Sequence, residues 1–185
     1  LLVGDGGVRG LVIEIGKGMD SISIEDNVMT VGAGTLVSKA ASAAASKGLS
    51  GMEFAAGIPG SIGGAVVMNA GAYGGEMKDI IVDASVITKE GAIRTLSLED
   101  LDLSYRHSSI IENEDIVIGA RLKLHQEDEA KIRQVMDDLR DRIVEQDGRR
   151  AIYFSDLSFN ANDEYRKMKY SRDSLLKSED LEEII

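Results

Sequence analysis

Alternation of apolar and polar residues along the chain predicts short strands joined by tight turns. Two pairs of alternating runs flank turn-forming residues, Asp26 and Asn27 in the first pair and Glu90 and Gly91 in the second, so each pair is expected to form a hairpin. β-Branched and alternating residues mark further strands outside these pairs. The paired runs are residues 21–24 with 28–31 and residues 80–87 with 92–96, and the other runs are residues 1–3, which end at a tight turn, 11–15 and 116–124.

Helices are expected where apolar or small residues recur with helical spacing between capping residues. Residues 35–47 carry a face of alanines, begin at Thr35 as the N-cap and stop at Gly48. Residues 128–146 form the clearest amphipathic pattern, and their apolar face is expected to pack against the core or another domain, with no sign of a cofactor. That face consists of Ile132, Val135, Met136, Leu139 and Ile143. Residues 97–100 predict the cap of a third, short helix.

Residues 51–75, here called the glycine-rich stretch, hold eight of the twenty glycines and the only proline. Dense glycine permits positive φ and close approach of the backbone, and it exposes N–H groups that can bind an anion such as a phosphate-bearing cofactor. Residues 54–75 carry no charged side chain, but their glycines and Pro59 leave too little apolar transfer energy for a membrane span. An ordinary buried loop is the alternative that spacing alone leaves open.

Composition and charge narrow the possible functions. The 185 residues, 43% of them hydrophobic, fit one domain or one domain plus an appendage. The net charge of −11 argues against a nucleic-acid or anionic-membrane surface, although a local basic pocket stays open. The absence of cysteine excludes disulfides and thiolate sites and is compatible with the cytoplasm. The chain opens on Leu1 inside an apolar run, without a visible signal peptide, so the true N-terminus is expected to be missing.

Arg106 is the best placed cation for holding an anionic substrate. It lies between a short predicted helix and a strand, flanked by the hydrogen-bonding residues Tyr105, His107 and Ser108. On the residues alone, a surface ion pair between Arg106 and Glu112 is the favoured alternative. His107 has the chemistry of a general base, yet a histidine without a visible partner is more often structural. No nucleophile elbow and no metal-ligand spacing occur, so no metal is expected.

Three segments together resemble the UDP-N-acetylenolpyruvoylglucosamine reductase family of bacterial cell-wall enzymes. They are Gly32-Ala-Gly-Thr35, residues 48–77 and Tyr105-Arg-His-Ser108. The core of the long segment, Ala55-Ala-Gly-Ile-Pro-Gly-Ser-Ile-Gly-Gly-Ala-Val-Val-Met-Asn-Ala-Gly-Ala-Tyr-Gly74, is highly specific. The resemblance covers residues 1 to about 146, and it overrides both the buried-loop alternative and the surface ion pair of Arg106.

The resemblance implies an α+β fold, namely an FAD-binding PCMH-type (vanillyl-alcohol-oxidase-like) module with a mixed β-sheet and flanking helices. Residues 1–127 would form this module, comprising its second subdomain and the end of its first. Residues 128–148 would form a connecting amphipathic helix, and residues 149–185 a divergent tail of no assigned role. Part of the first subdomain and the C-terminal substrate domain are expected to be absent.

The resemblance also implies the cofactors and the site residues. In the family NADPH reduces FAD, and the flavin passes hydride to the enolpyruvyl double bond of a UDP-sugar, giving UDP-N-acetylmuramate. Arg106 matches the family's active-site arginine, a fixed cation for the charge that develops on the substrate carboxylate. The residues that would line the flavin and its pyrophosphate, with backbone amides as donors, are Gly57, Ile58, Pro59, Gly60, Ser61, Gly63, Gly64, Asn69, Gly71, Ala72 and Tyr73.

Two family motifs have no match in this sequence: the Gly-Ser-x-Phe-Lys-type motif of the proton-donating serine and the motif of the C-terminal catalytic glutamate. The expectation is therefore a truncated or disrupted member whose natural activity is this cytoplasmic reduction in peptidoglycan synthesis. One alternative is a catalytically inactive remnant that binds flavin or is purely structural. Another is a sister flavoenzyme of the same fold. Neither nucleic acid nor membrane is expected as a partner, and the oligomeric state is not indicated.

Overall fold

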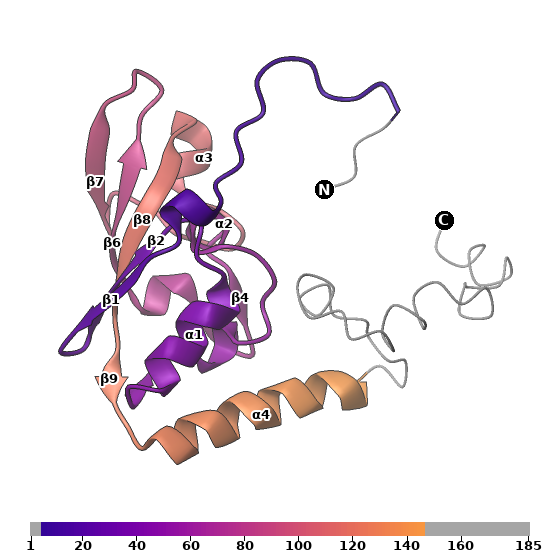
Figure 1. The fold of residues 1–185 in the computed structure, drawn as a ribbon, viewed down its shortest axis with the longest axis vertical. Coiled ribbons are helices and arrows are strands. Elements are labelled where there is room, and N and C mark those ends of the chain that lie inside the picture. The colour runs from indigo at the N-terminus through magenta and orange to yellow at the C-terminus, as the bar shows by residue number, and fades with distance from the viewer. Residues whose placement is uncertain (1–4, 147–185) are drawn as a thin grey trace, which may run out of the picture. The chain divides into compact units, whose positions relative to one another are not determined.

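A five-stranded sheet with the order β1-β2-β8-β6-β7 forms the centre of the computed structural model, which describes residues 5–146 (Figure 1). All four pairings between neighbouring strands are antiparallel. The strands are β1 (Ile22–Glu25), β2 (Val28–Gly32), β8 (Ile116–Lys123), β6 (Ile81–Ile87) and β7 (Ile93–Ser97). Because β8 lies in the middle, it joins the hairpin β1–β2 to the hairpin β6–β7.

The expected α+β class is confirmed, as are both hairpins. Asp26 (φ 53°) and Gly91 (φ 84°) supply the positive backbone angles that the two hairpin turns require. A mixed β-sheet was expected. Among the described strands of the main sheet, every pairing is antiparallel.

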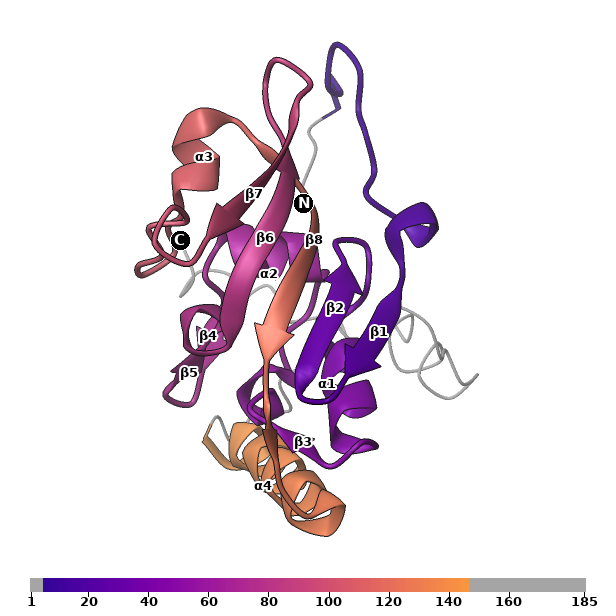
Figure 2. The ribbon, with the colours of Figure 1, turned by 90° about the vertical axis from the view of Figure 1, so that its left-hand side faces the viewer.

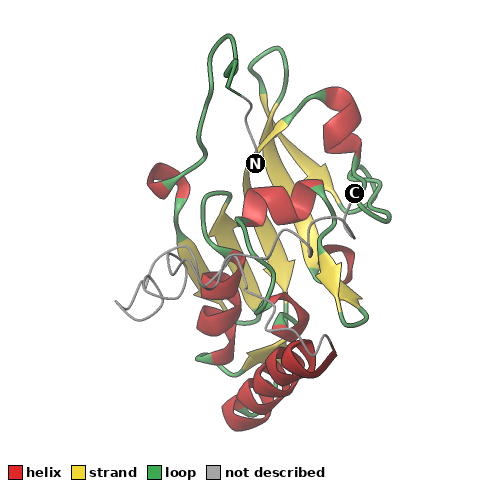
Figure 3. Cartoon of the chain, turned by 90° about the vertical axis from the view of Figure 1, so that its right-hand side faces the viewer, coloured by secondary structure: helices red, strands yellow, loops and turns green. Residues whose placement is uncertain are grey.

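Helices cover one face of the sheet. In Figure 2 the sheet is seen with α1 and α2 behind it, and Figure 3 shows the helices in front of the strands from the other side. The helices are η1 (Lys17–Met19), α1 (Val37–Ala45), η2 (Glu53–Ala55), α2 (Ile62–Val67), η3 (Met77–Asp79), α3 (Ser109–Asn113) and α4 (Glu129–Gln146). Among residues 5–146, no helix combines the length and the apolar character that a membrane crossing requires.

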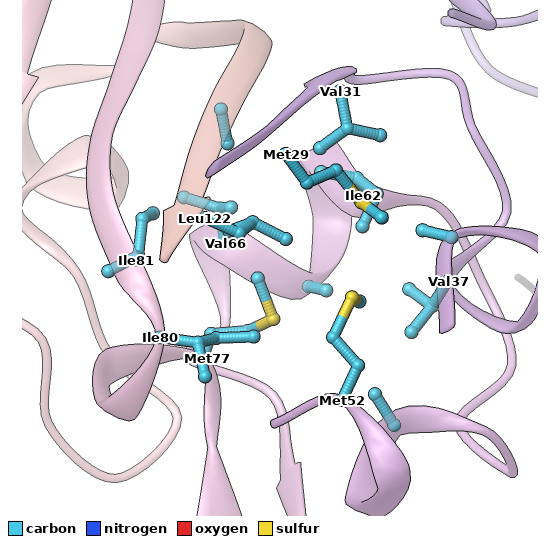
Figure 4. Packing of buried hydrophobic residues seen from close by; sticks show 14 of the residues in the cluster. Met29, Val31, Val37, Met52, Ile62, Val66, Met77, Ile80, Ile81 and Leu122 are labelled. Carbon is cyan, nitrogen blue, oxygen red and sulfur yellow. The ribbon is translucent and has the colours of Figure 1, made fainter. Parts of the chain in front are cut away.

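The hydrophobic core fills the space between this sheet face and the helices. Alternate residues of the strands point into it, so Met29 and Leu122, which are register partners on β2 and β8, are both fully buried. Ile62 and Val66, one helical turn apart on α2, pack against them (Figure 4). The alanine face of α1 is buried as expected, which lets this helix lie close to the core.

Two short sheets and α4 complete the described chain. The pair β3 (Leu49–Ser50) with β9 (His125–Gln126) leads into α4, and the pair β4 (Gly71–Ala72) with β5 (Gly75–Glu76) forms a hairpin within the glycine-rich stretch. The helix expected at residues 128–146 is confirmed as α4, with Ile132 buried and Met136 packed against the core.

Three local predictions were wrong. Residues 11–15 are not a strand: Leu11 is 87% exposed, and a β-branched run forms a strand only when it has a partner. Thr35 is not the N-cap of α1, because its hydroxyl bonds to Asp20 and to the main chain of Ser21 instead. Residues 97–100 form the expected capping bonds but lead into a turn rather than a helix. Residues 1–3 and the tail 149–185 lie outside the described residues.

Candidate functional site

The loop at residues 57–61 leads into α2 and is fixed to the connection that follows β2. Three main-chain bonds hold it there: the Val37 N–H donates to the Gly60 carbonyl (3.0 Å), the Ile62 N–H to the Thr35 carbonyl (2.8 Å) and the Gly63 N–H to the Ala33 carbonyl (2.9 Å). The hydroxyl of Ser61 accepts from the Gly64 N–H (3.5 Å) as the N-cap of α2. The first amides of α2 therefore already have acceptors within the chain.

Donors for a ligand are consequently found in the loop itself. Among the described residues, the N–H groups of Gly57, Gly60 and Ser61 donate no hydrogen bond to another main-chain group. Gly60 is exposed with φ at 118°, and nothing lies within 4 Å of the place where a Cβ would stand. Pro59 is exposed and Ile58 half-buried. Open amides on a fixed, exposed loop are suited to an anionic group.

Other glycines of the stretch serve packing. A Cβ on Gly63 would stand 3.0 Å from the Cβ of Ala33, one on Gly71 would stand 2.7 Å from the Gly75 carbonyl oxygen, and one on Gly75 would stand 2.8 Å from the Phe54 ring. These contacts explain the glycines without a ligand. Gly64, by contrast, is exposed. A Cβ on Gly64 would have the Ser61 hydroxyl as its nearest neighbour, at 3.8 Å.

A pocket of about 290 Å³ adjoins this unit. Gly57 and Tyr73 of the expected cofactor residues line it, together with Phe54 and two members of the apolar face of α4, Met136 and Leu139. Tyr73 has φ at 54° and is 46% exposed, and the adjacent Ala72 is half-buried. The apolar face of α4 thus contributes to a pocket wall as well as to the core, which its periodicity alone did not indicate.

Asn69, also expected at the cofactor, is 4% exposed and has a positive φ of 42°. Its side-chain amide donates to Glu76 Oε2 (2.9 Å) and to the Ser104 carbonyl (3.1 Å), and its Oδ1 accepts from the Lys78 N–H (2.9 Å). The side chain is therefore committed to groups of this chain. Both of its amide hydrogens are used.

Arg106 stands on a tight turn that we call the arginine turn (Ser104–His107). Ser104 and His107 bond to each other through both main-chain pairs at 3.2 Å, and Arg106 has φ at 51°, an angle that only glycine adopts without strain. Arg106 is exposed, and its guanidinium lies 5.8 Å from the centre of the Tyr105 ring. Among the described residues, no acidic side chain lies within ion-pair distance of it. Glu112 instead lies 3.8 Å from His107 Nε2, so the surface ion pair with Arg106 is not formed.

The segment before β1 covers the connection after β2. A Cβ on Gly34 would stand 2.2 Å from the Gly16 carbonyl oxygen, so this crossing requires glycine. Asp20 accepts from Lys39 Nζ (2.8 Å) and from the Thr35 hydroxyl (3.1 Å). The hydrogen bond from Lys39 is the main reason that the pKa of Asp20 lies below its ordinary value, and partial desolvation opposes this shift.

The structure groups the expected site residues in two places. Residues 57–64 form one unit of loop and helix, and Asn69 to Tyr73 form a second unit that bonds to the arginine turn. Lys78, which sequence reasoning did not single out, joins the second group through its Nζ, and no local pattern marked it. Among residues 5–146, no group of three or more His, Asp or Glu side chains could hold a metal ion.

Known proteins resemble this chain in sequence. Residues 1–97 match the FAD binding domain family. The UDP-N-acetylenolpyruvoylglucosamine reductase of Agathobacter rectalis is 50% identical over 157 residues, a match that covers 78% of this chain and 50% of the relative. The reductase of the same name from Levilactobacillus brevis is 50% identical over 142 residues, covering 77% of this chain and 46% of the relative. The chain thus spans half or less of the length of these relatives.

A solved structure adds agreement in fold. The crystal structure of UDP-N-acetylenolpyruvylglucosamine reductase from Thermus caldophilus matches with a TM-score of 0.57 and 40% sequence identity. The match covers 62% of this chain and 42% of that one. The family match over residues 1–97, the two similar sequences and the solved structure therefore all indicate the same relationship. The chain therefore belongs to the FAD binding domain family, in which its relatives are UDP-N-acetylenolpyruvoylglucosamine reductases.

Proposed function

We propose that this chain supplies the flavin-binding part and the substrate-clamping arginine of an FAD-dependent, NADPH-driven reduction of UDP-N-acetylglucosamine enolpyruvate to UDP-N-acetylmuramate. The observation that carries the proposal is the identity of 46–50% to reductases of that name over three quarters of the chain. The reaction would take place in the cytoplasm and serve peptidoglycan synthesis. A cysteine-free composition is compatible with that location.

The loop at residues 57–61 fits the phosphate groups of FAD. It offers the open N–H groups of Gly57, Gly60 and Ser61, and Gly60 leaves free space on the side where any other residue would place a Cβ. Backbone amides give an anion hydrogen bonds without adding a charged side chain. Bound FAD would supply the acceptor for hydride from NADPH and the donor of hydride to the substrate.

Two further groups of residues would complete the cofactor site. The first is Ile58, Pro59, Gly63 and Gly64 beside the loop amides, and the second is the β4–β5 hairpin with Gly71, Ala72 and Tyr73. The half-exposed Tyr73 ring lines the pocket next to Gly57 and would present an aromatic surface to a flat ring. Gly63 and Gly71 would act indirectly. Because they have no side chain, the backbone at these positions can pack closely against Ala33 and Gly75, respectively.

Arg106 would bind the carboxylate of the enolpyruvyl group. Its guanidinium is exposed and has no acidic partner among the described residues, so its donors are available for a bidentate bond. Hydride addition to the double bond moves negative charge toward the carboxylate. A cation that is already held in place stabilises that charge without further reorganisation.

Binding experiments on the purified chain test this proposal. FAD is titrated and followed by flavin fluorescence, and UDP-N-acetylglucosamine enolpyruvate is then titrated by calorimetry into the flavin-loaded chain. Arg106→Ala is expected to weaken substrate binding by about 30-fold, whereas Arg94→Ala, at an exposed arginine on β7, leaves it unchanged. Equal affinities in the two variants would contradict the role of Arg106.

Turnover separates this proposal from the two alternatives. The family's serine and glutamate motifs do not occur in these 185 residues, so no substrate-dependent NADPH oxidation by the chain alone is expected. Flavin binding without any substrate binding would favour the inactive flavin-binding module. Absence of flavin binding would favour a structural remnant. If the flavin-loaded chain instead bound a different oxidisable or reducible substrate tightly, a sister flavoenzyme would be favoured.

A further inference from the structure

The arginine turn is held at both ends by side chains that reach across from other segments. Where the turn begins, Lys78 Nζ donates to the carbonyl of the preceding residue, Leu103 (3.1 Å), and Asn69 Nδ2 donates to the carbonyl of the first turn residue, Ser104 (3.1 Å). After the turn, the hydroxyl of Ser108 donates to the Val67 carbonyl at the end of α2 (2.7 Å). All three bonds connect the turn and its flanking residues to the stretch of chain from Val67, the last residue of α2, to Lys78 in η3.

Asn69 is the central member of this set. One amide hydrogen goes to the arginine turn and the other to Glu76 at the end of the β4–β5 hairpin, while its oxygen accepts from the main chain of Lys78. At 4% exposure it is the least exposed polar residue of the hairpin region, and it keeps a positive φ to reach these partners. A single buried side chain thus touches both the hairpin proposed to line the cofactor and the turn that carries Arg106.

The turn itself offers little to fix its own position. Tyr105 is 86% exposed, Arg106 is exposed, and the strained φ of Arg106 persists only if surrounding contacts hold it. Leu101 and Leu103 anchor the approach to the turn in the core but do not reach its tip. The polar contacts are therefore what holds the main chain of the turn, and with it the Cα of Arg106, in place.

We propose that Asn69 is a positioning residue that holds the arginine turn against the β4–β5 hairpin, so that Arg106 is presented at a fixed place beside the glycine-rich stretch. Its side chain acts within the protein and binds no ligand. The functional consequence rests on the proposed function, because it assumes that Arg106 binds the substrate carboxylate. The structural part does not depend on that assumption.

Trypsin gives a direct reading of the turn, because it cleaves after Arg106. In Asn69→Ala the loss of the donor to Ser104 is expected to raise cleavage at Arg106–His107 about 10-fold, the equivalent of one hydrogen bond, relative to cleavage at Lys123–Leu124 at the end of β8. Asn69→Asp keeps the acceptor for the Lys78 N–H but loses both donors, so it is expected to behave like Asn69→Ala. If the substitution raises cleavage equally at both sites, or does not raise it at Arg106–His107, the proposal is overturned.

A second variant covers the case in which Asn69→Ala fails to fold. Lys78→Met removes the Nζ bond to the Leu103 carbonyl from an exposed side chain, so the fold is retained while cleavage at Arg106–His107 rises. Lys131→Met, at an exposed lysine of α4, is the matched control and leaves that cleavage unchanged. A rise in the control equal to that in Lys78→Met would also overturn the proposal.

Calorimetry with UDP-N-acetylglucosamine enolpyruvate tests the link to Arg106 through a double-mutant cycle. Asn69→Asp alone is expected to weaken binding of this ligand. Added to Arg106→Ala, it is expected to have no further effect, because Asn69 acts through Arg106. Additive effects would refute positioning. If the unchanged chain binds none of this ligand, the proposed function fails, and the proteolysis result alone decides whether Asn69 holds the turn.

Discussion

Gly63 and Gly64 are neighbours in α2, yet their surroundings predict opposite effects of the same substitution. Gly63 is buried, and a Cβ there would stand 3.0 Å from the Cβ of Ala33 and 3.3 Å from its carbonyl oxygen. Gly64 is exposed, and a Cβ there meets only the Ser61 hydroxyl at 3.8 Å. Replacing each glycine with alanine therefore separates helix propensity from packing within one helix.

The magnitudes follow from these distances. Alanine in place of glycine in a helix stabilises by about 0.5–1 kcal/mol, and this gain applies to both positions. At Gly63 the gain is opposed by overpacking against a main-chain segment fixed by hydrogen bonds, which costs about 1–3 kcal/mol. Gly63→Ala is thus expected to lower the free energy of unfolding by about 1 kcal/mol, and Gly64→Ala to raise it by a similar amount, about 1 kcal/mol.

Urea unfolding followed by far-ultraviolet circular dichroism measures both free energies, and thermal unfolding should separate the variants by about 4–8 °C. Equal stabilisation of the two variants would refute the packing argument for Gly63. The Gly64 variant has a second use, since Gly64 is also a proposed cofactor residue. A more stable chain with weaker FAD binding would show that this glycine is needed for the ligand rather than for the fold.

Three other predictions concern charged residues. Arg106→Gly is expected to change stability by less than about 1 kcal/mol, because relief of the positive φ offsets the added chain entropy, while substrate binding measured by calorimetry weakens by about 30-fold, as in Arg106→Ala. Strong destabilisation would mean that Arg106 is mainly structural. Asp20 has a lowered pKa in the folded chain, so its contribution is present above the unfolded pKa of about 4 and is lost as the pH falls through the folded value. The urea midpoint should consequently drop less in Asp20→Asn than in the unchanged chain between about pH 5 and about pH 3, and identical drops would contradict this origin. Arg121→Met leaves the buried carboxylate of Asp83 without its partner and is expected to lower the urea midpoint, whereas Asp83→Asn, which leaves a half-exposed arginine, should lower it clearly less. Similar decreases would show that burial of Asp83 is not the dominant effect.

Hairpins and the long helix could be predicted from the sequence because their signals are local. Alternation around a turn residue such as Gly91, or apolar spacing along α4, is sufficient to predict the element. Residues 11–15 carry the same β-branched signal, but no described strand pairs with them, and pairing is not encoded in the run itself. Thr35 failed as an N-cap for a related reason, since Asp20 competes for its hydroxyl from a distant position in the chain.

The sequence indicates which residues are candidates for the site, but it does not show how each of them is placed or bonded. Glycine density marked the loop at residues 57–61, yet it could not distinguish Gly60, which faces open space, from Gly63 and Gly75, whose missing side chains allow packing. Asn69 was expected at the ligand, and only the three-dimensional arrangement shows that its side chain is bonded within the protein. Lys78 carried no signal, because its partner is a carbonyl group 25 positions away in the chain.

The central place of β8 in the sheet has a consequence for folding during synthesis. The two hairpins β1–β2 and β6–β7 are complete once residue 97 has been made, but they cannot be joined until residues 116–123 arrive between them. Until then β2 and β6 each present an unpaired edge, the kind of surface that pairs with other chains. We therefore expect the nascent protein to be most prone to aggregation in the interval before β8 is made, and insertion of this one late strand to join the two hairpins and end that exposure.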